Sequence, residues 1–256
     1  MKLAIMQPYF LPYIGYFQAI YAVDKYILYS NVNFSKHSWI NRNRVLMKNG
    51  NTIIVSAPLI SQSSNTLIKS IKIFNDVDWN KRLLKTIYFN YKGAIYFEET
   101  YSFLENIFEN SFEYLYQLNG YLIESICNFI GIDTTIEYSN LNKYDDLEEM
   151  LLEIDKDNYS QFQYLLKTKP EKKVARILEL CKSENATTYI NAIGGQDLYS
   201  KEEFLKYGID LNFIKTEEFD YPQFNHNFQP NLSIVDVLMH NWSEGTKKLL
   251  DKHTLV

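Results

Sequence analysis

Glycine and cysteine are scarce in this chain of 256 residues. Its nine glycines are about half of what an ordinary usage of roughly 7% would give. None of them lies in a P-loop, a GxGxxG or a GxSxG motif, which argues against several common enzyme classes. The only cysteines, Cys127 and Cys181, are far apart and form neither a CxxC metal site nor a disulfide framework, so a reducing compartment is expected.

Signals for a membrane or for secretion are also missing from the sequence. No apolar run reaches the length of about 18 residues that a spanning helix needs. The apolar residues 3–6 are followed at once by Gln7 and Pro8, unlike the apolar region of a signal peptide. We therefore expect a cytoplasmic protein without a membrane span.

Basic charge is limited, and arginine is the rarer of the two strong cations. The net charge of −5 removes the basic footprint that general nucleic-acid binding needs, so any anion must be bound locally. Only four arginines occur, Arg42, Arg44, Arg82 and Arg176. Where lysine is the usual cation, an arginine points to a need for its planar fork of donors.

Apolar periodicity predicts an α/β fold. A strand at 3–6, a loop at 8–15, a helix at 16–23 and a strand at 25–29 form a βαβ opening, and such units place ligands at the carboxyl ends of their strands. Further predicted strands are 52–57, 68–74, 134–138, 187–190 and 211–214. Further predicted helices are 79–91, 98–109, 112–130, 145–157, 170–182, 201–207, 234–240 and a last one that follows Gly245 and ends at 252.

This alternation of strands and helices indicates one domain over residues 1–256. The expected architecture is a three-layer, mostly parallel Rossmann-like sheet. The helical segment at about 79–131 is expected to be an insertion or a subdomain.

The first candidate site is the loop after the first strand. Two prolines and a glycine fix its backbone, and they hold Gln7 and the hydroxyls of Tyr9, Tyr13 and Tyr16 near one strand end. Rigid loops with aromatic faces suit flat or sugar-like ligands. The alternative is that a chain with 21 tyrosines simply places them everywhere.

The second candidate site is the segment directly after the second strand. It combines polar, basic and aromatic residues, namely Asn33, Lys36, His37, Trp39, Asn41, Arg42 and Arg44. On a strand Arg42 and Arg44 share a face, and with Lys36 they could clamp a phosphate or a carboxylate. His37 could transfer protons or merely hydrogen-bond a phosphate. The alternatives are a solvated basic loop, or arginines paired with a buried carboxylate such as Asp24 or Asp236.

A third, weaker candidate joins a basic helix face to a glycine pair. Lys173 and Arg176 are three residues apart on a predicted helix, so they share a face. Gly194 and Gly195 follow a strand and precede Tyr199. The glycine pair indicates a close backbone approach to a ligand, a turn with positive φ, or an ordinary structural turn.

Asp236 and the histidines of the second half of the chain are weaker candidates for a functional site. Asp236 is a single carboxylate in an apolar helix, where a cap or a supporting role is favoured over catalysis although ligand contact stays open. His226, His240 and His253 lack the spacing of metal ligands, so no metal site is predicted.

Several of these blocks resemble the WbqC-like family. They are QPYFLPYIGYFQ at 7–18, WINRNR at 39–44, YIN at 189–191 with the glycine pair and LY at 198–199, and LSIVDVL at 232–238. The resemblance runs in order from about residue 3 to about residue 250. It implies a bacterial protein of surface-polysaccharide gene clusters, such as those for O-antigen and lipopolysaccharide, and a role with acylated amino sugars. In that family an Asp usually follows the tyrosine of the second strand, whereas Ser30 follows Tyr29 here.

The opening is also similar, more loosely, to nucleotidyltransferases and class I aminoacyl-tRNA synthetases. Two histidines flank a hydrophobic residue and a glycine in those proteins, and Tyr13 and Tyr16 stand in their places here. This likeness leaves ATP-dependent activation open.

Three functions follow as hypotheses. The first is a transferase that attaches a small acyl or aminoacyl group, such as glycyl, to the amine of a nucleotide-linked amino sugar, with His37, Lys36 and Gln7 as catalytic residues. The second is a non-catalytic module that binds a sugar nucleotide or a glycan. The third is an ATP-using enzyme related to nucleotidyltransferases. The sequence leaves the acyl donor, the cofactor and the oligomeric state open.

Overall fold

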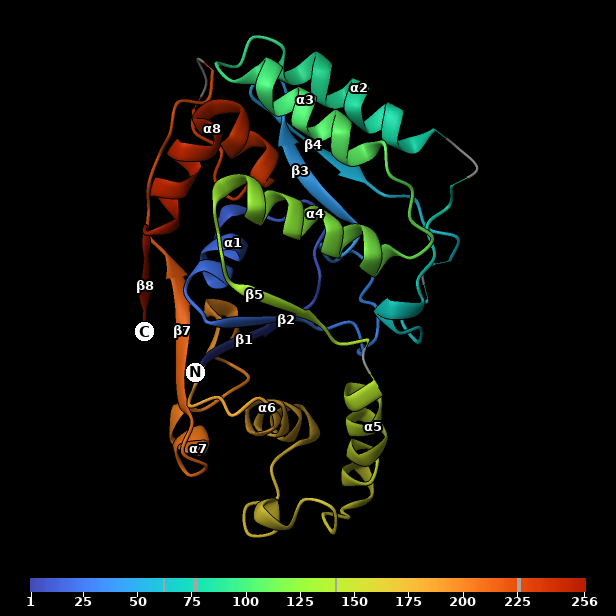
Figure 1. Cartoon of the computed structure of the whole chain (residues 1–256), viewed down its shortest axis with the longest axis vertical. Helices are drawn as coiled ribbons and strands as arrows, with labels where there is room; N and C mark the ends of the chain where they lie inside the picture. The colour runs from blue at the N-terminus through green and yellow to red at the C-terminus, as the bar shows by residue number, and fades with distance from the viewer. Residues whose placement is uncertain (62, 76–77, 141, 225–226) are drawn as a thin grey trace.

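The computed structural model describes the chain except for residues 62, 76–77, 141 and 225–226, and its centre is a β-sheet (Figure 1). Six strands lie in the order β5-β2-β1-β6-β7-β8. Their bounds are β1 Lys2–Met6, β2 Lys25–Leu28, β5 Thr135–Tyr138, β6 Thr188–Ala192, β7 Asp210–Thr216 and β8 His253–Leu255. All neighbouring strands are parallel except β8, which runs antiparallel to β7 at the edge. The predicted mostly parallel sheet is confirmed.

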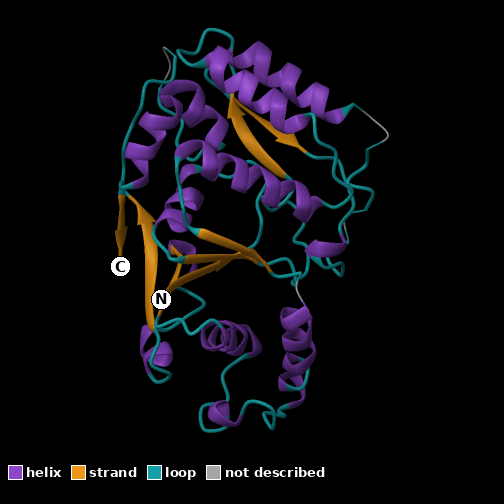
Figure 2. Ribbon diagram, viewed as in Figure 1, coloured by secondary structure: helices purple, strands orange, loops and turns teal. Residues whose placement is uncertain are grey.

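Helices cover both faces of the sheet, which gives the three layers that the sequence predicts (Figure 2). Strand residues alternate between two hydrophobic cores, with Ala4 and Tyr26 in one core and Leu3 and Ile27 in the other. The first core contains residues of α1 Ile14–Tyr21, α4 Leu115–Ile130 and α8 Ile234–Leu250, and the second contains residues of α5 Asn142–Leu151, α6 Lys172–Ser183 and α7 Lys201–Leu205.

A separate β-hairpin lies beyond the helices of the first face. In it β3 (Arg42–Leu46) pairs antiparallel with β4 (Thr52–Ser56). Helices α2 (Trp79–Tyr91) and α3 (Phe97–Phe108) lie beside the hairpin (Figure 1). Their buried side chains belong to the same hydrophobic core as those of α1 and α8, so the helical middle of the chain packs directly on the rest.

The strand order places a topological switch point between β1 and β6. From β1 the chain continues to β2 on one side, and β6 begins the other half of the sheet. In open α/β sheets ligands bind at such a point, outside the carboxyl ends of the strands. The loops after β1, β2, β6 and β7 therefore surround the place where a ligand is expected.

Several local predictions are wrong. The segment 68–74 is a 3₁₀ turn at Ile68–Ser70 followed by isolated bridges, because its backbone amides donate to three separate segments and form no continuous ladder. The helix predicted at 145–157 is α5, which begins earlier and ends at Leu151. The two helices predicted at the end of the chain are present, because α8 joins two helical segments across a kink at Trp242, whose φ of 57° and ψ of −170° are not helical; only the start of the second one differs, since it lies before Gly245.

Candidate functional site

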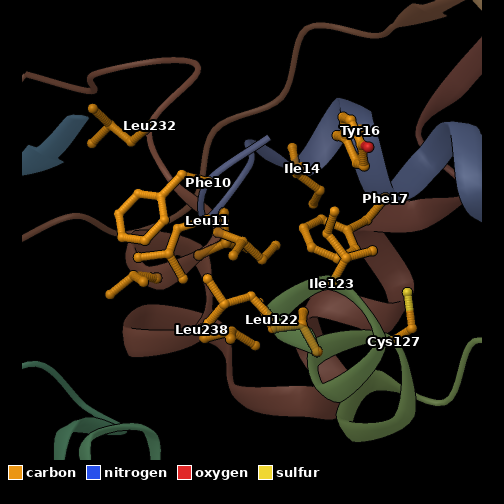
Figure 3. Close-up of a cluster of buried hydrophobic side chains, with 14 of the residues drawn as sticks. Phe10, Leu11, Ile14, Tyr16, Phe17, Leu122, Ile123, Cys127, Leu232 and Leu238 are labelled. Atoms are coloured by element: carbon orange, nitrogen blue, oxygen red, sulfur yellow. The ribbon is translucent and has the colours of Figure 1, made fainter. Parts of the chain in front are cut away.

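The first loop, residues 7–13, is anchored by its own side chains. Phe10 and Leu11 are fully buried. Figure 3 shows them gathered with Leu122 of α4 and Leu238 of α8. Leu11 has a φ of 43°, a left-handed conformation that leucine adopts only when its surroundings impose it. The packing of these two side chains provides that constraint.

Buried amides hold the backbone of the first loop. Asn43 donates its Nδ2 group to the carbonyls of Phe10 and Leu11, at 3.1 and 2.8 Å. Asn119 on α4 donates to the carbonyl of Pro8 at 2.8 Å and to that of Ile40 at 2.7 Å. Both amides are buried, so these bonds are shielded from water.

The start of α8 adds further supports to the first loop. The Ser233 hydroxyl donates to the carbonyl of Leu11 at 2.9 Å, and the Ile234 amide donates to that of Pro12 at 2.8 Å. The loop is thus bonded to three elements that are distant in the sequence.

The tetrapeptide 41–44 presents two different faces. Asn41 and Asn43 are buried, and Asn41 donates to the carbonyl of Ala57 at 3.1 Å. Arg42 and Arg44 are half-buried on the opposite side, since residues two apart on a strand share a face. The asparagine side therefore holds the first loop, and the arginine side is free to face a ligand.

The arginine pair, Arg42 and Arg44, flanks the ring of Trp39. The guanidinium carbons lie 5.9 and 5.7 Å from the ring centroid. Arg42 donates to the carbonyl of His37, and Arg44 to that of Asn231 at 3.5 Å. In the part of the chain that the structure describes, neither arginine contacts a carboxylate, and the Nε atoms of both are buried without a hydrogen-bond partner. The predicted alternative of pairing with Asp24 or Asp236 is wrong, because those carboxylates bond elsewhere.

The second loop, residues 33–41, meets the first. The Phe10 amide donates to the carbonyl of Trp39 at 3.0 Å. Asn33, Lys36 and His37 are exposed, and His37 has a φ of 64°. The structure thus brings the first and second candidate sites side by side at the carboxyl ends of β1 and β2.

The residues of the first loop differ in accessibility. Gln7, Tyr9 and Tyr13 are half-buried. Burial raises the pKa of Tyr9 and of Tyr13 above 10.0, so both hydroxyls stay protonated and can donate hydrogen bonds. Tyr16 is fully buried, and its hydroxyl donates to the carbonyl of Gln7 at 2.9 Å. Tyr16 therefore supports the loop from inside and has no open surface for a ligand.

The third candidate cluster lies on the opposite face of the sheet, and its cations are already paired. Arg176 makes a bidentate contact with Glu148 at 2.5 and 2.8 Å, and the Tyr29 hydroxyl donates to the same carboxylate at 2.5 Å. Lys173 pairs with Glu171 at 3.0 Å. Nothing local in the sequence distinguishes Glu148 from the other acids of α5, so its role could not be predicted.

The remaining parts of this cluster lie at the carboxyl end of β6. Gly194 and Gly195 belong to a 3₁₀ turn, and neither has positive φ. A Cβ on Gly195 would lie 2.4 Å from Nδ2 of Asn191, the end of a side chain that would have to move, whereas one on Gly194 would meet open space. Tyr199 is half-buried, with its ring 6.3 Å from that of Tyr189.

Asp236 is fully buried in α8. It accepts hydrogen bonds from the hydroxyls of Tyr91 and Tyr221, at 2.8 and 2.7 Å, and from Nε2 of Gln223 at 2.7 Å. Burial raises the pKa of this carboxyl, and the three donors oppose that shift. Asp236 thus joins α2, α8 and the loop before α8, and a ligand at the sheet edge does not reach it.

The described residues were also compared with the requirements of a metal site and of a membrane-spanning helix. No group of three or more histidine, cysteine, aspartate or glutamate side chains could hold a metal ion there, and His226 lies outside the described residues. None of the described helices combines the length and the apolar character that crossing a bilayer requires.

The fold and the site define a class of protein: a Rossmann-like α/β protein with two fixed loops and an arginine pair at the carboxyl edge of its sheet. The chain belongs to the WbqC-like protein family, whose model matches residues 7–248. It is also 27% identical to an uncharacterized protein of Mycobacterium tuberculosis over 246 residues, which is 95% of each chain. No solved structure matches the chain closely enough to count as a relative.

Proposed function

We propose that this protein is a transferase that attaches a small acyl or aminoacyl group, such as glycyl, to the amine of a nucleotide-linked amino sugar. The arginine pair carries this proposal. Two guanidinium groups share one strand face, lack a carboxylate partner among the described residues, and retain buried Nε–H groups without acceptors. A buried donor without a partner is costly, and a phosphate oxygen would supply the missing acceptor.

The environment of the pair favours a phosphate ligand. The chain carries a net charge of −5, so a positive site for an anion must be local. Trp39 packs against both guanidinium groups, which limits their motion and offers an aromatic face beside the anion. A diphosphate has enough oxygens to engage both forks.

The proposed reaction uses residues of the two loops. The sugar amine attacks the acyl carbon of an activated donor, the amine proton passes to His37, and the leaving group departs with the bonding electrons. Lys36 and the Gln7 amide are hydrogen-bond donors for the oxyanion that forms at the acyl oxygen. Tyr9 and Tyr13 supply further donors, and ATP is one possible source of donor activation.

A second candidate function is a non-catalytic sugar-nucleotide or glycan-binding module. The observation that favours it is the state of His37, which is exposed and whose ring has no hydrogen-bond partner in the described part of the chain. A catalytic base is usually oriented by a second group. If His37→Ala leaves both ligand affinity and product formation intact, His37 is not the base of a transferase.

Exchange of the arginines for lysine tests the proposal. Lysine keeps the charge and loses the planar fork, so Arg42→Lys or Arg44→Lys should weaken the binding of a nucleotide-linked sugar by roughly 1–3 kcal/mol, about 5- to 150-fold in Kd. Calorimetric titration with nucleotide sugars, nucleotides and pyrophosphate measures the effect. The melting temperature of the free protein should change little.

Arg82→Lys is the matched control, because Arg82 is an exposed arginine on α2, outside the two loops. Equal affinity in the wild type and in both loop variants would show that the pair is not an anion site. A large loss of stability without ligand would show instead that these arginines hold the fold together.

A further inference from the structure

We propose that the sugar of the ligand binds in a hollow at the carboxyl end of β7, while its phosphates lie at the arginine pair. This inference rests on the proposed function for the position of the phosphates. The hollow has a volume of about 580 Å³, within the range of roughly 300–1,000 Å³ that small-molecule sites have. Residues that line it include Ile14, Glu217, Phe219, Asp220, Tyr221 and Phe228.

The hollow adjoins the arginine pair. Asn231 lines the hollow, and its carbonyl accepts a hydrogen bond from Arg44 at 3.5 Å. Ile14, the first residue of α1, also lines the hollow and directly follows the first loop. A phosphate held by Arg44 therefore lies one residue away from the hollow, a separation that a sugar linked to that phosphate can span.

Aromatic side chains line the hollow, as they do in many sugar-binding sites. Phe219, Tyr221 and Phe228 line it, and the rings of Tyr221 and Phe228 pack edge to face with centroids 5.0 Å apart. The Tyr221 hydroxyl bonds to Asp236, so the polar end of this side chain is already engaged. Aromatic surfaces of this kind stack on the apolar face of a sugar ring.

Polar groups at the hollow favour a sugar with a free amine. Glu217, Glu218 and Asp220 line the hollow and are exposed, and no cationic side chain of the described residues pairs with any of them. A protonated amine is the sugar substituent that gains most from such carboxylates beside aromatic rings. The arginine pair and the hollow together match a ligand with a negative phosphate and a positive amine on one sugar.

Glucosamine 1-phosphate and glucose 1-phosphate test the hollow without a choice of nucleotide, because they differ only in the amine. In calorimetric titrations, the wild type should bind the amino sugar at least about fivefold more tightly. In the triple variant Glu217→Gln, Glu218→Gln, Asp220→Asn the two sugar phosphates should bind about equally, with little change for glucose 1-phosphate and for inorganic phosphate. Phe228→Leu should weaken both sugar phosphates alike. The control Glu244→Gln, an exposed acid outside the lining, should keep the preference.

Equal binding of both sugar phosphates by the wild type, no binding of either, or a preference that survives in the triple variant would overturn the proposed sugar site. The phosphate site is tested separately by inorganic phosphate and the two lysine variants. If those variants leave phosphate binding unchanged while the amine preference depends on the three acids, the sugar site is supported and the proposed phosphate site is wrong.

Discussion

Asp236 and His240 lie one helical turn apart inside the protein and are stabilised differently. The carboxylate accepts bonds from three donors, whereas Nε2 of His240 is buried, has no hydrogen-bond partner among the described residues, and lies 4.0 Å from Asp236. The imidazole packs against Phe224, with ring centroids 4.8 Å apart. An imidazole in such surroundings is more stable when neutral.

Stability should therefore depend on pH through His240. Burial lowers its pKa below 6.5, and Asp236 opposes this shift. A group with a lowered folded-state pKa stabilises the fold above its unfolded pKa, and this contribution is lost as the pH falls through the folded value. Between pH 7.5 and 5, the free energy of unfolding should fall more in the wild type than in His240→Leu, by up to about 1.4 kcal/mol per pH unit.

Urea unfolding at several pH values measures this difference. His253→Gln, which removes a histidine outside the cluster, is the control and should keep the wild-type slope. An identical pH dependence of His240→Leu and the wild type would show that this imidazole does not titrate with unfolding.

At the scale of the element, Asn119 connects α4 to both loops of the candidate site. Asn119→Ala leaves the carbonyls of Pro8 and Ile40 without their donors, which should lower the free energy of unfolding by roughly 1–3 kcal/mol. Hydrogen exchange of the peptides around residues 8–11 and 37–41 should become faster. Asn128→Ala, at an exposed position of the same helix, is the control. Unchanged exchange in both peptides would mean that other contacts suffice to hold the loops.

The local sequence pattern predicted some helices and strands correctly and missed others. The helices of the middle segment follow clear apolar periodicity, and Gly131 ends α4 in the left-handed conformation, with φ 71°, as expected. Strand β3 was missed because its inward positions include Asn43, a polar residue whose partners are carbonyls of a distant loop. The role of Arg176 depends on Glu148, 28 residues away, so the helix sequence alone could not distinguish a paired cation from a free one.

At the scale of the whole molecule, the parallel sheet could be predicted because its strands are short apolar runs separated by helices. The edge strand β8 could not, because three residues near the end of the chain carry no periodic signal. The segment that contains β8 pairs with β7 through backbone hydrogen bonds. The amide of Phe213 donates to the carbonyl of Val256 at 2.8 Å, and the amide of Val256 donates to the carbonyl of Phe213 at 2.9 Å. These bonds occupy the outer edge of β7.

Removal of residues 253–256 should therefore expose an unpaired strand edge. Such edges pair with other chains, so the shortened protein should have a lower melting temperature and a light-scattering mass that rises more steeply with concentration. Leu255→Ala keeps the backbone ladder and is the control. A shortened protein that scatters like the full chain would show that β7 is protected by other means.

The supports of the first loop have a consequence for biosynthesis. The carbonyl of Leu11 is bonded to Ser233, 222 residues further along the chain. A ribosome therefore delivers the loop 222 residues before this partner. Throughout translation the nascent chain carries the loop without its bonds to α8. The loop therefore gains this support only after α8 has been made, and an interrupted translation product that lacks α8 lacks it altogether.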